Sequence, residues 1–153
     1  MANTYSQVYI QLVFAVKSRE ALINESFRDE LQKYMSGIIA NRECKLCAIY
    51  ANPDHVHALV RMHPSVSISN LVRDIKSNTS KFINEKAFMP CRFQWQDGHG
   101  AFSYSASHVD SVIKYILNQP QHHKKRNFRS EYVDILQKFG VDYDERFLFD
   151  WIL

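Results

Sequence analysis

The segment Asp54-His55-Val56-His57-Ala58-Leu59-Val60 decides the fold. Two histidines spaced i, i+2 within an apolar run fit a β-strand, in which alternate side chains share one face. The imidazoles of His55 and His57 therefore project from the same side, with Cα atoms roughly 7 Å apart. The opposite side carries only apolar residues: Val56, Ala58, Val60 and Met62. The segment thus predicts a metal site on a sheet that is buried on its other face.

Around this strand the sequence predicts the order β-α-β-β-α-β, followed by further helices. We expect strands over 5–16, 44–50 and 55–62, and one or two short strands within 93–104. Expected helices cover 27–40, capped by Ser26, then 67–86, 107 to about 123, and 130–139, which Gly140 ends. This order is that of a ferredoxin-like (RRM-like) α+β fold, an antiparallel sheet with its first and third strands in the centre. Two helices would cover one face and leave the face of His55 and His57 for something else.

Length and composition favour one ordinary globular domain over 1–153. The chain has 153 residues and a net charge of +3 with the histidines neutral, which does not by itself indicate a polyanionic partner. It contains no apolar run long enough for a transmembrane helix and does not open like a signal peptide, so we expect no membrane association and a cytoplasmic location. The charge is gathered in one basic run, 122–129.

The predicted helix over 107–123 brings two chemically useful side chains together. Tyr115 and Gln119 are spaced i, i+4, so they lie one above the other beside the apolar stripe of the helix. The Gln119 carbonyl can bind a hard cation, and the Tyr115 phenol can attack an electrophile. A pair at this spacing more often does nothing but border a core. Pro120 follows Gln119 directly, so the helix either ends or kinks there.

Taken together, the two motifs resemble a known family. His55-Val56-His57, followed by Tyr115-Ile116-Leu117-Asn118-Gln119, is similar to the single-tyrosine HUH transposases of insertion sequences. Further similar segments span most of the chain: 9–18, Asn52-Pro53-Asp54, Trp95-Gln96-Asp97-Gly98 and Gly100-Ala101-Phe102-Ser103. The later residues, Asn118-Gln119 and His122-His123-Lys124, resemble the group related to REP-associated tyrosine transposases.

The resemblance implies a metal-dependent DNA strand transferase that acts on single-stranded DNA and recognises hairpins at the ends of an element. By position, His55, His57 and Gln119 would be metal ligands and Tyr115 the nucleophile. The implied ion is Mg²⁺ or Mn²⁺, although imidazole ligands alone would favour other metals. The implied product is a 5′-phosphotyrosine link with a free 3′-hydroxyl. The resemblance also implies a homodimer, in which Tyr115 serves its own subunit or the partner.

Several further residues are candidates for DNA contacts or for support of the site. Asp54 would orient a histidine or lie near the metal, unless it only forms an Asx turn. Basic residues would neutralise phosphates or would simply face water. They form two groups, the first in the basic run and the second on the predicted helix over 67–86: Lys124, Lys125, Arg126 and Arg129; Arg73, Lys76 and Lys81.

Two other functions compete with strand transfer. A domesticated, non-transposing relative would bind DNA hairpins without chemistry, and a metal-dependent hydrolase would use an activated water in place of Tyr115. A covalent DNA adduct that requires Tyr115 would distinguish strand transfer from both of these alternatives.

Overall fold

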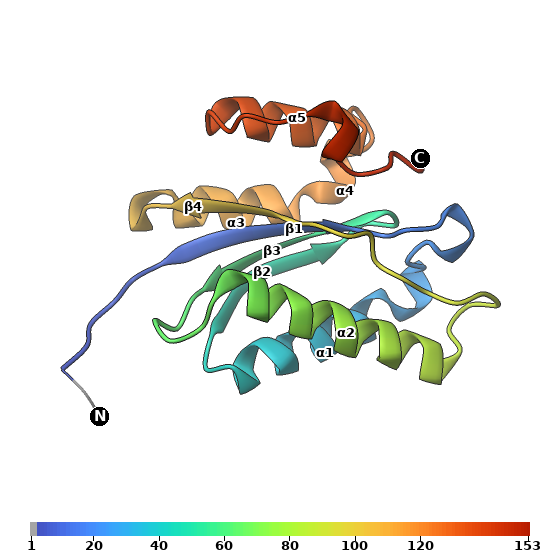
Figure 1. The fold of residues 1–153 in the computed structure, drawn as a ribbon, viewed down its shortest axis with the longest axis horizontal. Helices are drawn as coiled ribbons and strands as arrows, with labels where there is room; N and C mark the ends of the chain where they lie inside the picture. The colour runs from blue at the N-terminus through green and yellow to red at the C-terminus, as the bar shows by residue number, and fades with distance from the viewer. Residues whose placement is uncertain (1–2) are drawn as a thin grey trace.

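A computed structural model describes residues 3–153 and contains a four-stranded antiparallel sheet. The strands are β1 (Tyr9–Ala15), β2 (Lys45–Ala51), β3 (His55–Arg61) and β4 (Gly100–Tyr104), in the order β2-β3-β1-β4. The helices are α1 (Glu25–Asn41), α2 (Ile68–Lys86), α3 (Val109–Leu117), α4 (Gln119–His122) and α5 (Phe128–Lys138). The predicted ferredoxin-like α+β fold is confirmed, with β1 and β3 in the centre (Figure 1).

One face of the sheet carries buried apolar side chains and is covered by α1 and α2 (Figure 1); we call it the dry face. In the register of β1 and β3, Phe14 lies opposite Val56 and Leu12 lies opposite Ala58, and all four side chains are buried. They join the apolar stripes of both helices in one continuous core. This is the face that the alternation of apolar residues predicts.

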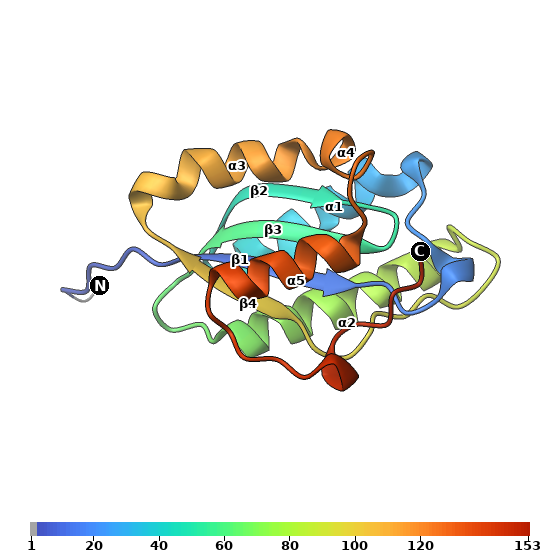
Figure 2. The same cartoon turned by 90° about the horizontal axis from the view of Figure 1, so that it is seen from above.

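The other face carries His55 and His57 and is covered by the C-terminal helices. Figure 2 shows α3 running along β2, while α5 crosses above β1 and β4. Two separate apolar clusters hold them, one between α3 and Leu59 and one between α5 and Phe102. The histidine strip lies between these clusters, so the C-terminal helices enclose it.

The predicted helix over 107–123 is broken into two, which resolves the question that Pro120 raised. Helix α3 ends at Leu117, and α4 begins at Gln119 with Pro120 in its first turn. Proline has no N–H to donate, so it suits the first turn of a new helix but not the interior of a continuous one.

Other boundaries differ from the predictions in smaller ways. The first strand begins at Tyr9, and the cap of α1 is Asn24, whose side chain accepts from the Ser26 N–H, so the prediction of Ser26 as the cap is wrong. Within 93–104 only β4 is a strand, although Trp95 forms an isolated bridge with Val16. Between residues 3 and 153, no helix has both the length and the apolar character needed to cross a membrane.

Candidate metal centre and tyrosine site

His55 and His57 project from β3 into the space beneath α5, and both are fully buried. The Nδ1 atom of His55 lies 2.7 Å from Asp54 Oδ1, and the Nδ1 atom of His57 lies 2.8 Å from Gln11 Oε1. Carboxylate and amide oxygens only accept hydrogen bonds, so each Nδ1 is the donor. This fixes the tautomer and directs both Nε2 atoms toward the same point, as in histidines that bind metals. Asp54 therefore lies where support of His55 requires it.

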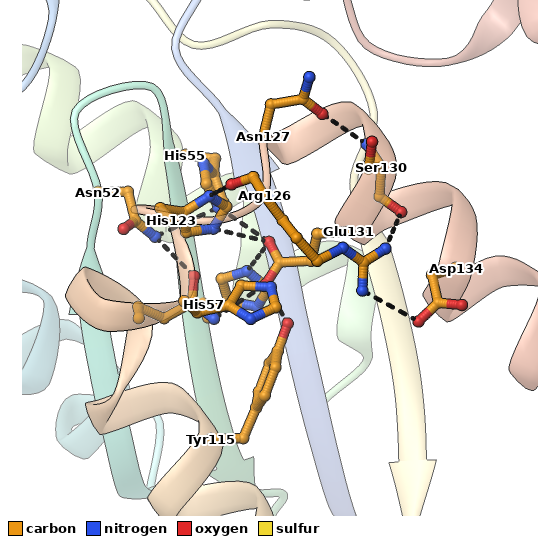
Figure 3. A network of polar contacts seen from close by, with 12 residues as sticks. Asn52, His55, His57, Tyr115, His123, Arg126, Asn127, Ser130, Glu131 and Asp134 are labelled. Atoms are coloured by element: carbon orange, nitrogen blue, oxygen red, sulfur yellow. Dashed lines mark hydrogen bonds and ion pairs between the residues drawn. The ribbon is translucent and has the colours of Figure 1, made fainter.

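Glu131 of α5 occupies that point (Figure 3). Its Oε1 atom lies 3.2 Å from His55 Nε2 and 3.0 Å from His57 Nε2, and the residue is 2% exposed. Glu131 was not among the site residues predicted from the sequence. The available clue was a carboxylate on the apolar stripe of α5, between Phe128 and Tyr132, where a charge needs a partner.

His123, just after α4, also faces Glu131. Its Nε2 atom lies 3.1 Å from Glu131 Oε1, and its Nδ1 atom donates to the Arg126 carbonyl at 2.9 Å. One potential ligand atom from each of His55, His57, His123 and Glu131 lies within 4.8 Å of the other three. Imidazole nitrogens and a carboxylate are metal ligands, so this donor set fits a divalent cation.

Tyr115 and Gln119 reach the same carboxylate from the other side. The Tyr115 hydroxyl donates to Glu131 Oε2, and Gln119 Nε2 donates to the same oxygen at 2.9 Å. The Gln119 carbonyl accepts from Asn52 Nδ2 at 3.0 Å, and Gln119 is fully buried. The fold thus brings together the two motifs that the sequence analysis singled out.

Burial and the charge of Glu131 together shift the pKa values of several groups in the centre. Burial alone would raise the pKa of Glu131, but the surrounding imidazoles, His57 foremost, hold it well below its usual range. Burial lowers the pKa of His57. Burial also acts to lower the pKa of His55, but hydrogen bonds and charges from Asp54 and Glu131 outweigh it, so the pKa of His55 is raised. The pKa of Tyr115 is raised by burial and by the negative charge of Glu131. The phenol is accordingly protonated in this arrangement.

The predicted basic residues fall into two locations. Lys124, Lys125, Arg126 and Arg129 lie beside the centre, between α4 and the first turn of α5, and all four are exposed. Arg126 is 3.6 Å from Asp134, and Arg129 is 3.0 Å from Glu145.

Arg73, Lys76 and Lys81 lie on α2, which covers the opposite face of the sheet from the histidines (Figure 1). The Lys76 ammonium donates to the carbonyls of Gln96 and Gly98 at 2.8 and 2.6 Å, and burial lowers its pKa. The structure therefore does not bring this group to the centre.

Comparison with known proteins identifies the family and related folds. No curated protein matches the chain. A candidate transposase from Deinococcus radiodurans R1 has a similar structure, with a TM-score of 0.61 and 22% identity, over 78% of this chain and 95% of the other. A REP-associated tyrosine transposase bound to a REP hairpin also gives a TM-score of 0.61, at 14% identity, over 80% of this chain and 73% of the other. At these identities the two likenesses show the fold alone. The model of the IS200-like transposases matches residues 4–119, and the chain belongs to this family.

Proposed function

We propose that this protein cuts and rejoins single-stranded DNA with Tyr115 as the nucleophile and a divalent cation at the histidine pair. One observation carries the proposal. Tyr115 and Gln119, from the α3–α4 segment, meet His55 and His57 of β3 at a single buried carboxylate. Membership of a transposase family supports DNA as the substrate. The likeness to a transposase bound to a REP hairpin supports a hairpin as the recognised form.

His55, His57 and Gln119 would hold the cation, which is Mg²⁺ or Mn²⁺ in this proposal. Asp54 and Gln11 hold the two imidazoles in the tautomer that leaves Nε2 free to bind it. The bound cation would stabilise negative charge on the scissile phosphate, an effect worth several kcal/mol. It would also offset the charge of Glu131, which adds to the effect of burial in raising the pKa of Tyr115.

Tyr115 would attack the phosphorus of a DNA phosphodiester. A bond forms between the phenolic oxygen and phosphorus, and the bond from phosphorus to the 3′ oxygen breaks. The phenol loses one proton and the departing 3′ oxygen gains one. The products are a 5′-phosphotyrosine and a free 3′-hydroxyl, and attack by a 3′-hydroxyl on the tyrosyl phosphate rejoins the strand. Each exchange replaces one phosphodiester by another, so no nucleotide cofactor is consumed.

DNA would approach along the basic residues next to the centre. Lys124 and Lys125 are exposed, close to Tyr115 in the chain, and suited to phosphate contact. We also propose that the protein works as a homodimer. Contact of Tyr115 with Glu131 of the same chain supports action of the tyrosine within its own subunit.

Trapping the covalent intermediate tests this proposal. Incubation with a single-stranded hairpin substrate and Mn²⁺ should give a protein–DNA adduct that survives denaturation, and mass spectrometry should locate the DNA on Tyr115. Tyr115→Phe should abolish the adduct. Tyr132→Phe is the matched control, because Tyr132 is also buried on the same face of the sheet. If Tyr132→Phe removes the adduct and Tyr115→Phe does not, the assignment of the nucleophile is wrong.

A hairpin-binding protein without strand transfer is the second candidate. The specific observation in its favour is the raised pKa of Tyr115, which opposes formation of the nucleophilic phenolate. It predicts tight hairpin binding that EDTA does not weaken, and no adduct with any intact hairpin.

A further inference from the structure

We infer that the metal centre of this protein is completed by two side chains of its C-terminal segment, His123 and Glu131. The ion would then be held by three imidazoles and a carboxylate. Gln119, proposed above as a ligand, would instead support that carboxylate, to which its side-chain amide donates. A first-row transition ion such as Mn²⁺ or Zn²⁺ would bind more tightly than Mg²⁺. This inference rests on the proposed function for the roles of His55 and His57.

The first argument is convergence. The Nε2 atoms of His55, His57 and His123 lie between 3.0 and 3.2 Å from one atom, Glu131 Oε1. They come from β3 and from the turn after α4, which are far apart in the sequence. The four ligand atoms lie within 4.8 Å of one another. Bonds of about 2.0–2.2 Å to one ion would draw the three imidazoles together around an ion placed between them and Oε1.

The second argument is the state of the histidine rings. Each of the three has its Nδ1 atom beside an oxygen that can only accept: Asp54 Oδ1 at 2.7 Å, Gln11 Oε1 at 2.8 Å and the Arg126 carbonyl at 2.9 Å. His123 therefore has the same arrangement as the two histidines of β3. Orientation of the ring by a second hydrogen bond is the usual support of a metal-binding imidazole.

The third argument is that the two carboxylate oxygens of Glu131 contact different partners. Its Oε1 atom faces the three imidazoles. Its Oε2 atom accepts from Tyr115 and Gln119 and also lies 3.2 Å from His122 Nε2. One carboxylate can thus bind an ion through one oxygen and keep the tyrosine beside it through the other. A buried carboxylate also favours a positive charge close by, which a divalent ion supplies.

The chemistry of the donors selects the ion. Imidazole suits zinc, iron, nickel and copper, whereas Mg²⁺ favours oxygen ligands and keeps several waters. His123 and Glu131 both lie beyond residue 119, where the match to the family model ends. The stronger site would consequently be a property of the C-terminal segment of this chain. Phe128, at the start of α5, also links the C-terminal segment to the histidines, because its ring stacks on that of His55 with centroids 3.7 Å apart.

Metal binding to the whole chain tests the inference. Purified protein, stripped with EDTA, would be titrated with ZnCl₂, MnCl₂ and MgCl₂ by calorimetry, with bound metal counted by elemental analysis. We expect one ion per chain, with Zn²⁺ and Mn²⁺ ahead of Mg²⁺. His123→Ala and Glu131→Gln should each weaken binding at least tenfold, on the order of the loss known for supporting residues of metal sites. They should also reduce the rise in Tm that the ion causes.

Matched controls separate a ligand from a charge effect. His108→Ala and Glu145→Gln remove an exposed histidine and an exposed carboxylate near the same helices, and both should bind the ion like the unmodified protein. Glu131→Gln keeps the size of the side chain, and His123→Gln replaces His123→Ala if circular dichroism shows that the alanine variant is unfolded. Co²⁺ absorption bands, which follow the ligand set, should change in the His123 and Glu131 variants but not in the controls.

Two results would overturn the inference. One is binding of wild-type strength in the His123 and Glu131 variants while His55→Ala loses the ion. The other is no binding of any of these ions by the unmodified protein. Tyr115→Phe should retain the ion and lose the DNA adduct, so a failure of strand transfer is visible separately from a failure of the four-residue centre.

Discussion

The two faces of the sheet are built from alternate residues of the same strands, yet they differ in almost every property. Leu12, Phe14, Val56 and Ala58 face α1 and α2 in one continuous apolar core. Gln11, His55 and His57 face the C-terminal helices, where the apolar contacts are divided into two smaller clusters. The comparison shows that one face stabilises the fold, whereas the other gives up continuous packing in exchange for a buried polar centre.

The polar face is stable because most of its buried polar groups are hydrogen-bonded to one another; the buried Nε2 atom of His122 is an exception among the described residues. Gln11 accepts from His57 and donates to Tyr104, and Asn52 donates to Gln119. A buried polar group without a partner would cost about 1–3 kcal/mol, so these contacts allow histidines to occupy a sheet centre. The dry face needs no such network.

The largest expected effect is on the dry face. Phe14→Ala should lower the free energy of unfolding by about 3–5 kcal/mol, because the ring is fully buried and packs edge-on against Trp95. Urea unfolding followed by circular dichroism measures this loss. Phe102→Ala makes the same change on the polar face and should cost less, because Phe102 packs beside the half-exposed Phe139. An equal or larger loss for Phe102→Ala would contradict the proposed division between the faces.

An intermediate effect is expected at Gly100 of β4, which lies against Tyr132 of α5. A Cβ atom at this position would lie 2.6 Å from Tyr132 Oη and 2.8 Å from Phe102 Cε2. Both neighbours are buried, so Gly100→Ala should cost about 1–3 kcal/mol through overpacking. Thermal unfolding of the variant provides the measurement. Gly37→Ala is the control, because a Cβ there meets nothing within 4 Å. Equal Tm values for the two variants would show that α5 is not held at this distance.

The smallest effect concerns pH and the Tyr132 hydroxyl. Burial raises the pKa of Tyr132 from 10.0 to about 12. Above pH 10 the unfolded chain loses this proton before the folded protein does, so the unfolded state binds fewer protons and stability falls as pH rises. By about pH 12 the loss from this residue should approach 2 kcal/mol, and below pH 10 it should vanish.

The difference between the unmodified protein and Tyr132→Phe isolates that contribution, because other groups titrate equally in both. As the pH rises from about 9 toward 12, the urea midpoint of the unmodified protein should fall more steeply than that of Tyr132→Phe. Parallel pH profiles would mean that the Tyr132 hydroxyl is not buried in solution.

Periodicity predicted the elements well because it reflects burial directly. The alternation in 55–62 indicated β3 and its two faces, and Ser67 and Lys86 bounded α2 closely. Local chemistry was harder to place. Asn24 rather than Ser26 caps α1, and the break at Asn118 separates α3 from α4, because the choice between a kink and a stop depends on what Gln119 contacts.

The sequence by itself determined the strand that carries His55 and His57, the helix that carries Tyr115, and the resemblance that joined them. Only the tertiary structure decided that Glu131 and His123 meet those residues, because no periodic pattern relates β3 to α5. Periodicity indicates which side of an element is buried. Which other element packs against that side depends on the path of the chain through the fold. Here α5 returns across β1 and β4 (Figure 2). It thereby brings the Glu131 carboxylate to the Nε2 atoms of His55 and His57.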